Sequence, residues 1–173
     1  MSERPVTAAY LERAALHYLE RYASNAENLR RVLARKVRRR LAPGELVTEE
    51  MIAMIAEVVE RVIRSGLVDD RSYADMKVSA LMRRGASTRA IRTKLMAKGV
   101  PGETVASALD ANEPDDLTLA RRYAERKRLG PWRREPNPAL HGKDLAALCR
   151  AGFPFRIAAE ALGASPEQDD QSP

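Results

Sequence analysis

Side chains of the kinds used in catalysis are few and poorly spaced in this chain of 173 residues. It has two histidines, His17 and His141, and one cysteine, Cys149. None of them has a Cys or His partner at the spacing of a zinc site, and the chain has neither a GxxxxGK[ST] phosphate loop nor a GxGxxG dinucleotide motif. The adjacent pair Asp69-Asp70 could bind a metal, but capping of the helix that follows explains it more simply. We therefore expect no catalytic residue, no metal and no cofactor, in a protein that is not an enzyme.

The charged side chains whose spacing is distinctive are basic. The chain has 30 Lys and Arg against 24 Asp and Glu, a formal net charge of +6, and many of the basic residues gather in three runs. Blocks of one sign create local potentials larger than the net charge suggests, and three of them predict a surface that faces a polyanion. The simpler alternative is three solvated helix faces. The candidate binding residues are Arg30, Arg31, Arg35, Lys36, Arg38, Arg39 and Arg40 in the first run, Arg83, Arg84, Arg89, Arg92, Lys94 and Lys98 in the second, and Arg121, Arg122, Arg126, Lys127 and Arg128 in the third.

Acidic residues separate the basic runs. Glu49 and Glu50 follow the first run, Asp69 precedes the second, and Asp115-Asp116 precedes the third. A phosphate backbone would repel these carboxylates, whereas a protein partner can present charges of both signs. The alternation favours a nucleoprotein partner. Direct binding to DNA or RNA, and a helical scaffold for some acidic protein, are the alternatives.

The elements that must position these charges are predicted to be helices. Ala, Leu, Arg and Glu dominate, and aromatic residues make up only 5% of the chain, so the composition favours helices over strands. Apolar residues at helical spacing mark about nine helices in three sets of three. We expect an all-α fold of three tandem three-helix repeats, at residues 1–66, 67–112 and 113–163, with a disordered tail at 164–173. Small repeats share apolar surface by stacking, so we expect an elongated, curved body rather than one compact bundle, which is the alternative.

Capping residues and glycines predict where individual helices begin and end. Ser24 or Asn25 begins the second helix, Thr48 the third, and Ser87 the fifth. Gly66 stands at the position that ends the third. The apolar face expected for the first helix comprises Tyr10, Leu11, Ala14, Ala15, Tyr18, Leu19 and Tyr22, and that of the third comprises Ile52, Ile55, Ala56, Val59 and Ile63.

Internal similarity supports the division into repeats. Arg21-Tyr22-Ala23-Ser24 resembles Arg84-Gly85-Ala86-Ser87, and Leu95-x3-Gly99-Val100 resembles Leu148-x3-Gly152-Phe153. The same local signals therefore recur in successive sets of helices.

Two linked motifs resemble one protein family. The stretch from Gly66 to Ala74, GLVDDRSYA, resembles the G-x-[IV]-D-D-x-x-[FY]-A signature of RecX proteins, which are bacterial regulators of RecA recombinase. The stretch from Gly85 to Val100, with Ser87, Ile91, Leu95 and Lys98-Gly99, resembles the G-x-S-x-x-x-I-x-x-x-L-x-x-K-G-[IV] motif that follows in that family. The resemblance covers about residues 10 to 163 and is strongest from Gly66 to Val100.

The resemblance implies a function. RecX proteins consist of three tandem three-helix repeats, bind along RecA–DNA filaments, block their extension or promote their disassembly, and need no cofactor. They thereby restrain RecA ATP hydrolysis, strand exchange and coprotease activity. This chain departs from the family pattern at Val37, where a Gly usually ends the second helix, and in the Pro-rich loop from Gly130 to Gly142.

The remaining signals concern compartment and partners. Cys149 has no partner for an internal disulfide, and the longest strongly apolar stretch, around Met51 to Val59, is far too short to span a bilayer. The first residues contain no apolar segment of a signal peptide. We expect a cytoplasmic monomer without membrane contact, whose partners are the RecA filament and, weakly, single-stranded DNA.

Overall fold

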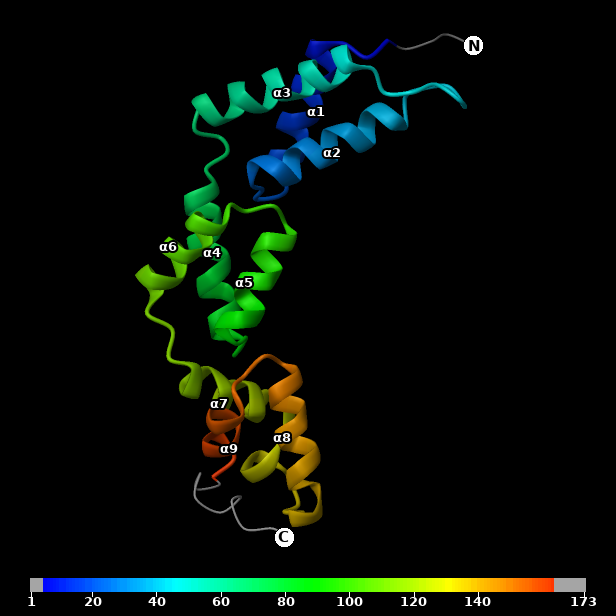
Figure 1. Cartoon of the computed structure of the whole chain (residues 1–173). Coiled ribbons are helices and arrows are strands. Elements are labelled where there is room, and N and C mark those ends of the chain that lie inside the picture. The colour runs from blue at the N-terminus through cyan, green and yellow to red at the C-terminus, as the bar shows by residue number, and fades with distance from the viewer. Residues whose placement is uncertain (1–4, 164–173) are drawn as a thin grey trace. The chain divides into compact units, whose positions relative to one another are not determined.

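A computed structural model describes residues 5–163, and in these residues nine α-helices and two short 3-10 helices occur without any strand (Figure 1). The all-α class and the number of helices predicted from the sequence are therefore confirmed. The tail expected at 164–173 lies outside the described residues. The helices are α1 (Ala8–Leu19), α2 (Ala26–Arg38), α3 (Glu49–Arg64), α4 (Asp70–Arg83), α5 (Thr88–Ala97), α6 (Gly102–Asn112), α7 (Asp116–Lys127), η1 (Gly130–Trp132), η2 (Pro138–Leu140), α8 (His141–Arg150) and α9 (Phe155–Ala161).

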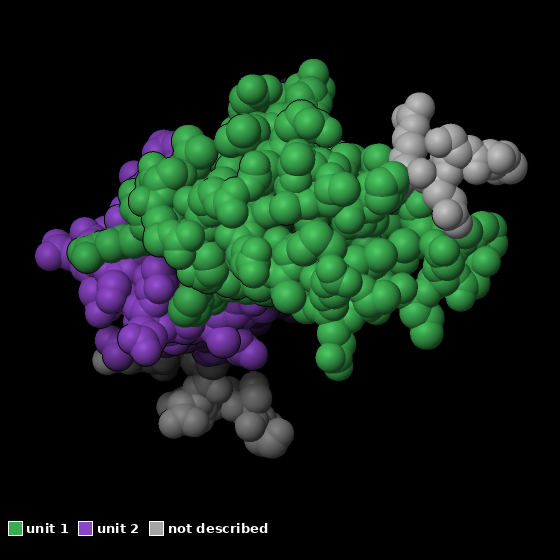
Figure 2. Space-filling model, turned by 90° about the horizontal axis from the view of Figure 1, so that it is seen from above, with its two compact units in different colours: residues 1–73, 97–101 green, residues 74–96, 102–173 purple. Residues whose placement is uncertain are grey.

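The chain divides into two compact units. Unit 1 comprises residues 1–73 and 97–101, and unit 2 comprises residues 74–96 and 102–173; Figure 2 shows them in green and purple. Unit 1 therefore contains α1, α2 and α3, the first turn of α4, and the turn that links α5 to α6. The boundaries predicted for three repeats, after residues 66 and 112, stay a prediction.

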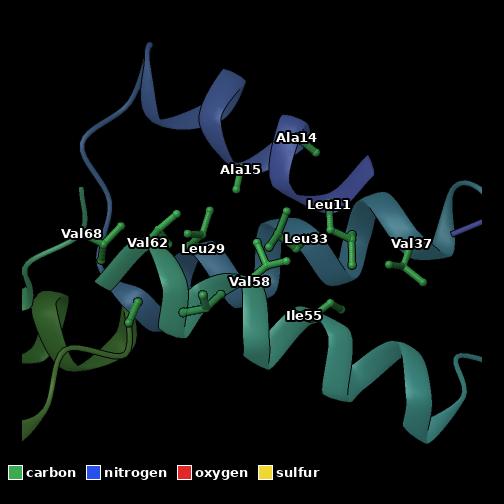
Figure 3. Packing of buried hydrophobic residues seen from close by; sticks show 12 residues of the cluster. Leu11, Ala14, Ala15, Leu29, Leu33, Val37, Ile55, Val58, Val62 and Val68 are labelled. Atoms are coloured by element: carbon green, nitrogen blue, oxygen red, sulfur yellow. The ribbon is translucent and has the colours of Figure 1, made fainter. Parts of the chain in front are cut away.

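The core of unit 1 lies between α1, α2 and α3 (Figure 3). Leu11 of α1 and Leu29 and Leu33 of α2 are fully buried there. Burial of such side chains is the main source of stability in a small helical unit, at roughly 1.5–3 kcal/mol for each large apolar side chain. The core packs these leucines against Ile55, Val58, Val59 and Val62 of α3.

Two details of the predicted apolar faces are wrong. In α3 the buried stripe includes Val58 and Val62, whereas Ile52 is 57% exposed and Ala56 is exposed. The helix carries apolar residues on more than one side, so the periodic pattern does not single out the side that packs. Tyr22 is 57% exposed and lies beyond the end of α1, which stops at Leu19.

The predicted caps are confirmed. Asn25, one of the two candidates, is the N-cap of α2, and its Oδ1 accepts a hydrogen bond from the Asn28 N–H at 3.0 Å. The Thr48 hydroxyl accepts from the Met51 N–H at the start of α3. Gly66 has φ +76°, the left-handed conformation in which glycine commonly ends a helix.

The core of unit 2 joins α7, α8 and α9. Leu119 of α7 and Leu148 of α8 are almost fully buried, and Phe153 and Leu162 complete the cluster. The Tyr123 and Phe153 rings meet edge to face with centroids 6.0 Å apart, a geometry that aromatic pairs prefer.

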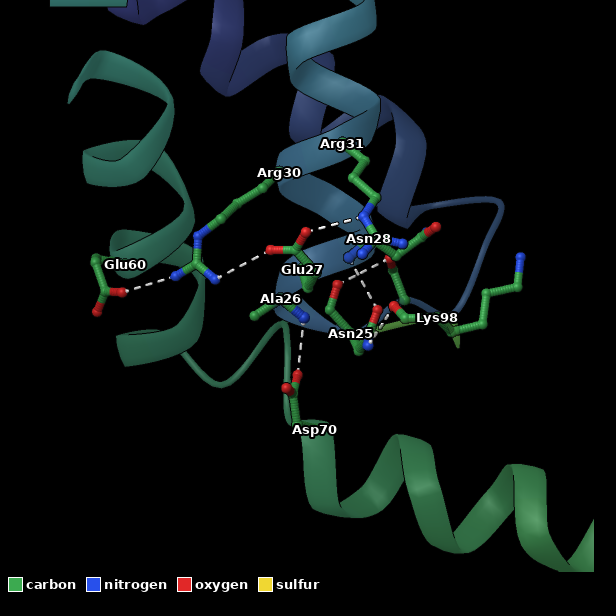
Figure 4. A network of polar contacts seen from close by, with 10 residues as sticks. Asn25, Ala26, Glu27, Asn28, Arg30, Arg31, Glu60, Asp70 and Lys98 are labelled. Carbon is green, nitrogen blue, oxygen red and sulfur yellow. Dashed lines mark hydrogen bonds and ion pairs between the residues drawn. The ribbon is translucent and has the colours of Figure 1, made fainter. Parts of the chain in front are cut away.

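A polar joint holds the start of α2 in unit 1 (Figure 4). The Asp70 carboxylate accepts from the Ala26 N–H at 2.8 Å, and the Asn25 amide donates to the Lys98 carbonyl at 3.1 Å. The Gly99 backbone passes so close to Glu27 that a Cβ on residue 99 would lie 2.7 Å from the Glu27 Cβ. Three segments distant in sequence thus meet at the N-terminus of α2.

The same joint recurs in unit 2 at the start of α5. The Asp116 carboxylate accepts from the Thr88 N–H at 3.1 Å, and the Ser87 hydroxyl donates to the Ala151 carbonyl at 2.8 Å. A Cβ on Gly152 would lie 2.6 Å from the Ser87 hydroxyl oxygen. The two joints position the basic helices α2 and α5 through equivalent Asp, cap and Gly residues.

Candidate polyanion-binding surfaces

Two arginines of the first basic run form ion pairs within unit 1 (Figure 4). The Arg30 guanidinium lies 3.2 Å from Glu60 and 3.9 Å from Glu27. Arg31 pairs with Glu27 at 2.9 Å and donates to the Ala97 carbonyl at 3.0 Å. These two arginines join α2 to α3 and to the end of α5, so their charge is not freely available to a ligand.

The C-terminal part of α2 carries the free cations of this run. Arg35, Arg38 and Arg39 are exposed and form no ion pair with any described residue. Lys36 is half-buried, and the Arg40 guanidinium lies 4.0 Å from the centroid of the Tyr10 ring, within range of a cation–π contact.

The second run is exposed throughout. Arg89, Arg92 and Lys94 lie on α5, a helix without any acidic residue, and Lys98 follows it. Arg83 and Arg84 stand at the C-terminal end of α4. No ion pair joins any of these six side chains to another residue in the 5–163 range.

The third run lies on the exposed side of α7 and at its end. Arg121, Arg122, Arg126, Lys127 and Arg128 are all exposed, whereas Leu119, Ala120 and Ala124 face the core. The Arg126 guanidinium lies 5.4 Å from the centroid of the Tyr123 ring. Arg128 ends the helix in the left-handed conformation, with φ 55°.

The second and third runs meet where α4 ends against α7. Gly85 has φ +68°, and a Cβ at this position would lie 2.5 Å from the Tyr123 backbone nitrogen and 2.9 Å from the Arg122 carbonyl carbon. The residues that precede Gly85 therefore adjoin the turn of α7 that carries two further arginines. We call Arg83, Arg84, Arg121 and Arg122 the α4–α7 basic patch. The sequence places its two halves 37 residues apart, and only the close approach at Gly85 joins them.

Sequence reasoning missed a buried ion pair in the Pro-rich loop. Asp144 of α8 is 3% exposed, and its Oδ2 accepts from the Arg133 Nε at 3.0 Å and from the Gly130 N–H at 2.8 Å. The Arg133 Nη2 donates to the other oxygen of Asp144. Burial raises the pKa of Asp144, but the bonds from Arg133 and Gly130 outweigh it and hold the pKa below its ordinary value. The Asp and Arg are eleven residues apart, and no local pattern predicts that they pair.

The geometry offers little support for a metal site or for a membrane-spanning helix. Among residues 5–163, no three His, Cys, Asp or Glu side chains cluster as metal ligands would. Asp69, considered above as half of a metal pair, accepts from the Arg71 N–H at 3.0 Å and so caps its own helix, while Asp70 belongs to the joint with α2. No helix in the described part of the chain combines the length and hydropathy needed to cross a bilayer.

Comparison with known proteins identifies the family. Residues 69–109 match the family model described as RecX, second three-helix domain. The chain is 44% identical over 167 residues to the regulatory protein RecX of Myxococcus xanthus, covering 94% of this chain and 89% of that protein. The chain belongs to the RecX family. A second RecX relative, from Agrobacterium fabrum, is 30% identical over 92% of this chain and 85% of its own length. The family indicated by the motifs from Gly66 to Val100 is thereby confirmed.

Solved structures of RecX proteins share the fold. The crystal structure of RecX from Lactobacillus salivarius aligns with a TM-score of 0.65 at 19% sequence identity, over 90% of this chain and 94% of that one. At this identity the likeness concerns the fold alone. This chain and the RecX from Lactobacillus salivarius thus share a fold although most of their aligned residues differ.

Proposed function

We propose that this RecX-family chain is a non-enzymatic regulator that binds the RecA–DNA filament and limits its extension. Binding inhibits RecA ATP hydrolysis, strand exchange and coprotease activity. The protein acts in the cytoplasm as a monomer and needs no cofactor. Family membership supports a regulatory role, because the relatives from Myxococcus xanthus and Agrobacterium fabrum are both named regulatory proteins.

The observation that carries the proposal is the set of exposed cations without acidic partners. All six cations of the second run and the five of the third are exposed and form no ion pair with a described residue, although the charge of Arg121 acts on the nearby Asp115 carboxylate. Unpaired surface cations attract a polyanion and release its counterions on binding. An assembled nucleoprotein filament offers both phosphates and acidic side chains, so such cations favour it as a partner.

Carboxylates near these cations support a partner that contains protein. Glu125 is exposed on α7 between Arg122 and Arg126, and Asp115 is exposed just before that helix. A phosphate backbone alone would be repelled by both, and a protein surface could pair with them. This favours the filament over direct binding of bare DNA or RNA, which remains the competing function.

A binding measurement with and without RecA separates these functions. Fluorescently labelled oligothymidylate, bare or coated with RecA from the same organism and a non-hydrolysable ATP analogue, is titrated with the full chain. We expect clearly tighter binding to the coated strand. Equal affinity for the two would favour direct nucleic-acid binding and contradict the proposal.

Charge reversal locates the contact. Arg→Glu changes at Arg83, Arg84, Arg121 and Arg122 are expected to weaken binding to the coated strand. The matched control reverses four exposed arginines elsewhere, at Arg13, Arg21, Arg64 and Arg156. Equal losses in both variants would mean that net charge alone, and not the α4–α7 basic patch, carries the binding.

A further inference from the structure

The Pro-rich loop is organised around the buried Asp144 carboxylate. Asp144 receives both Nε and Nη2 of Arg133 and also the Gly130 N–H, so the guanidinium is held from one side in a forked geometry. The Arg133 side chain keeps 26% of its surface exposed. A buried ion pair adds little stability over an apolar contact of the same volume. Its distinctive consequence is a cation fixed at the surface, whose Nη1 makes no hydrogen bond to a residue in the described part of the chain.

This cation lines a hollow of about 480 Å³. Arg128 and Arg134 also line the hollow; both are exposed and form no ion pair with a described residue. Arg128 reaches this position from the end of α7 in a left-handed conformation, φ 55°, that non-glycine residues seldom adopt. Two further arginines thus converge on the one that Asp144 holds.

The polar groups of the hollow are mainly donors. Asn137 lines it, and because its Oδ1 accepts from the Ala139 N–H at 3.2 Å, the amide NH2 group is left to donate. Glu135 is the one carboxylate among the lining residues. Asp144 is not among the residues that line the hollow, whereas Arg133, which binds the Asp144 carboxylate, is one of them. A wall of three guanidinium groups and one amide against a single carboxylate is suited to an anion with several acceptor oxygens.

We propose that this hollow binds a phosphate group, supplied either by a nucleic-acid backbone or by a free phosphate compound. Guanidinium groups donate charge-assisted hydrogen bonds to phosphate oxygens, and Arg133, whose Nε and Nη2 bind Asp144, holds its Nη1 in a fixed orientation before a phosphate binds. The proposal goes beyond the filament contact proposed above: Arg128 is one of those candidate residues, but Arg133, Arg134 and Asn137 lie outside them. It gives the loop from Gly130 to Gly142 a role as a phosphate site of unit 2.

Pyrophosphate titration of the full chain, without RecA or DNA, tests the site. Backbone amide and arginine Nε–H signals are followed by ¹H–¹⁵N NMR. We expect saturable shifts confined to residues 128–140 and to the Arg133 Nε–H. The double variant Arg128→Gln, Arg134→Gln should lose affinity at least about tenfold, since it removes two charge-assisted donors. The control Arg150→Gln, Arg156→Gln removes two exposed charges elsewhere in unit 2 and should bind as the wild type does.

A second variant tests the positioning of Arg133. Arg133→Lys keeps the charge but loses the forked contact with Asp144 that orients the side chain, so pyrophosphate affinity should fall while the amide spectrum outside the loop is unchanged. Competition by oligothymidylate for the same signals identifies the backbone as the phosphate source; binding of DNA without these shifts identifies a free phosphate compound. The proposal is overturned if pyrophosphate leaves residues 128–140 unshifted, or if the Arg128, Arg134 double variant binds it like the wild type. Neither result depends on the action on RecA.

Discussion

At the start of α4, and again at the start of α7, two adjacent aspartates have different hydrogen-bonding roles. Asp69 and Asp115 cap their own helices, and hydrogen bonds lower the pKa of both carboxyls. Asp70 and Asp116 instead accept from the second helix of the preceding set, at Ala26 and Thr88. The sequence identifies the first role, because caps are local. It cannot identify the second, because the donors lie 44 and 28 residues away.

Gly85 and Gly66 allow a matched test of close packing. Both have positive φ, +68° and +76°, so alanine at either position incurs a backbone strain on the order of 1 kcal/mol. At Gly66 a Cβ meets nothing within 4 Å, whereas at Gly85 it would lie 2.5 Å from the Tyr123 nitrogen of α7. We expect Gly85→Ala to lower the free energy of unfolding, measured in urea, well beyond Gly66→Ala. Equal losses would show that α4 does not approach α7 as described.

Acid should weaken the loop anchored by Asp144. The pKa of Asp144 is lower in the folded protein than the ordinary value of 3.8, so its contribution to stability is fully present above pH 3.8 and is lost as the pH falls through the lower, folded-state pKa. We expect the unfolding free energy of the wild type to decrease below about pH 4. Asp144→Asn should be less stable at neutral pH and show a shallower decrease in acid. Since Asp69 and Asp115 shift in the same direction, some pH dependence remains in the variant.

At the scale of helices, the ends are easier to predict than the buried faces. Thr48, Asn25 and Ser87 begin helices as their side chains predict, because an N-cap bond spans only two or three residues. The buried face of α3 was partly mispredicted because Ile52 and Ala56 are apolar but exposed. The side of such a helix that becomes buried depends on the helices that pack against it, and the spacing of apolar residues within the helix does not reveal where those helices lie.

The joint at the N-terminus of α2 makes a prediction for the helix as a whole. Asp70→Ala removes the acceptor of the Ala26 N–H, and loss of such a cap costs about 0.5–2 kcal/mol. Hydrogen exchange of amides in the first turn of α2 should accelerate more than that in α9. The control Asp110→Ala removes an exposed carboxylate of α6 that accepts no side-chain bond in the described residues. Similar exchange in both variants would exclude a structural role for Asp70 at α2.

At the scale of the whole molecule, the sequence predicted the class of fold and the family but not which cations are free. Charge runs look alike in sequence, yet Arg30 and Arg31 are paired with Glu27 and Glu60, while the second and third runs form no ion pair with any residue from 5 to 163. The difference depends on acids brought near by folding. We propose that three tandem repeats, at 1–66, 67–112 and 113–163, present these runs to the filament in succession.

Direct binding of single-stranded DNA should be weak and sensitive to salt. Each phosphate neutralised on a single strand contributes about 0.7 to the slope of log K against log salt concentration. We expect the quadruple Arg→Glu variant of the α4–α7 basic patch to reduce the magnitude of this slope by about two to three, because four contacts with phosphates are lost. An unchanged slope in fluorescence anisotropy titrations would place the DNA contact elsewhere.

The central claim is that this chain restrains RecA. The most direct test is the rate of ATP hydrolysis by RecA from the same organism on single-stranded DNA, titrated with the full chain. We expect hydrolysis to fall as the protein is added. Inhibition should be weakened by charge reversal at Arg83, Arg84, Arg121 and Arg122, and kept when Arg13, Arg21, Arg64 and Arg156 are reversed instead. Hydrolysis that stays constant in excess of folded protein would contradict the account.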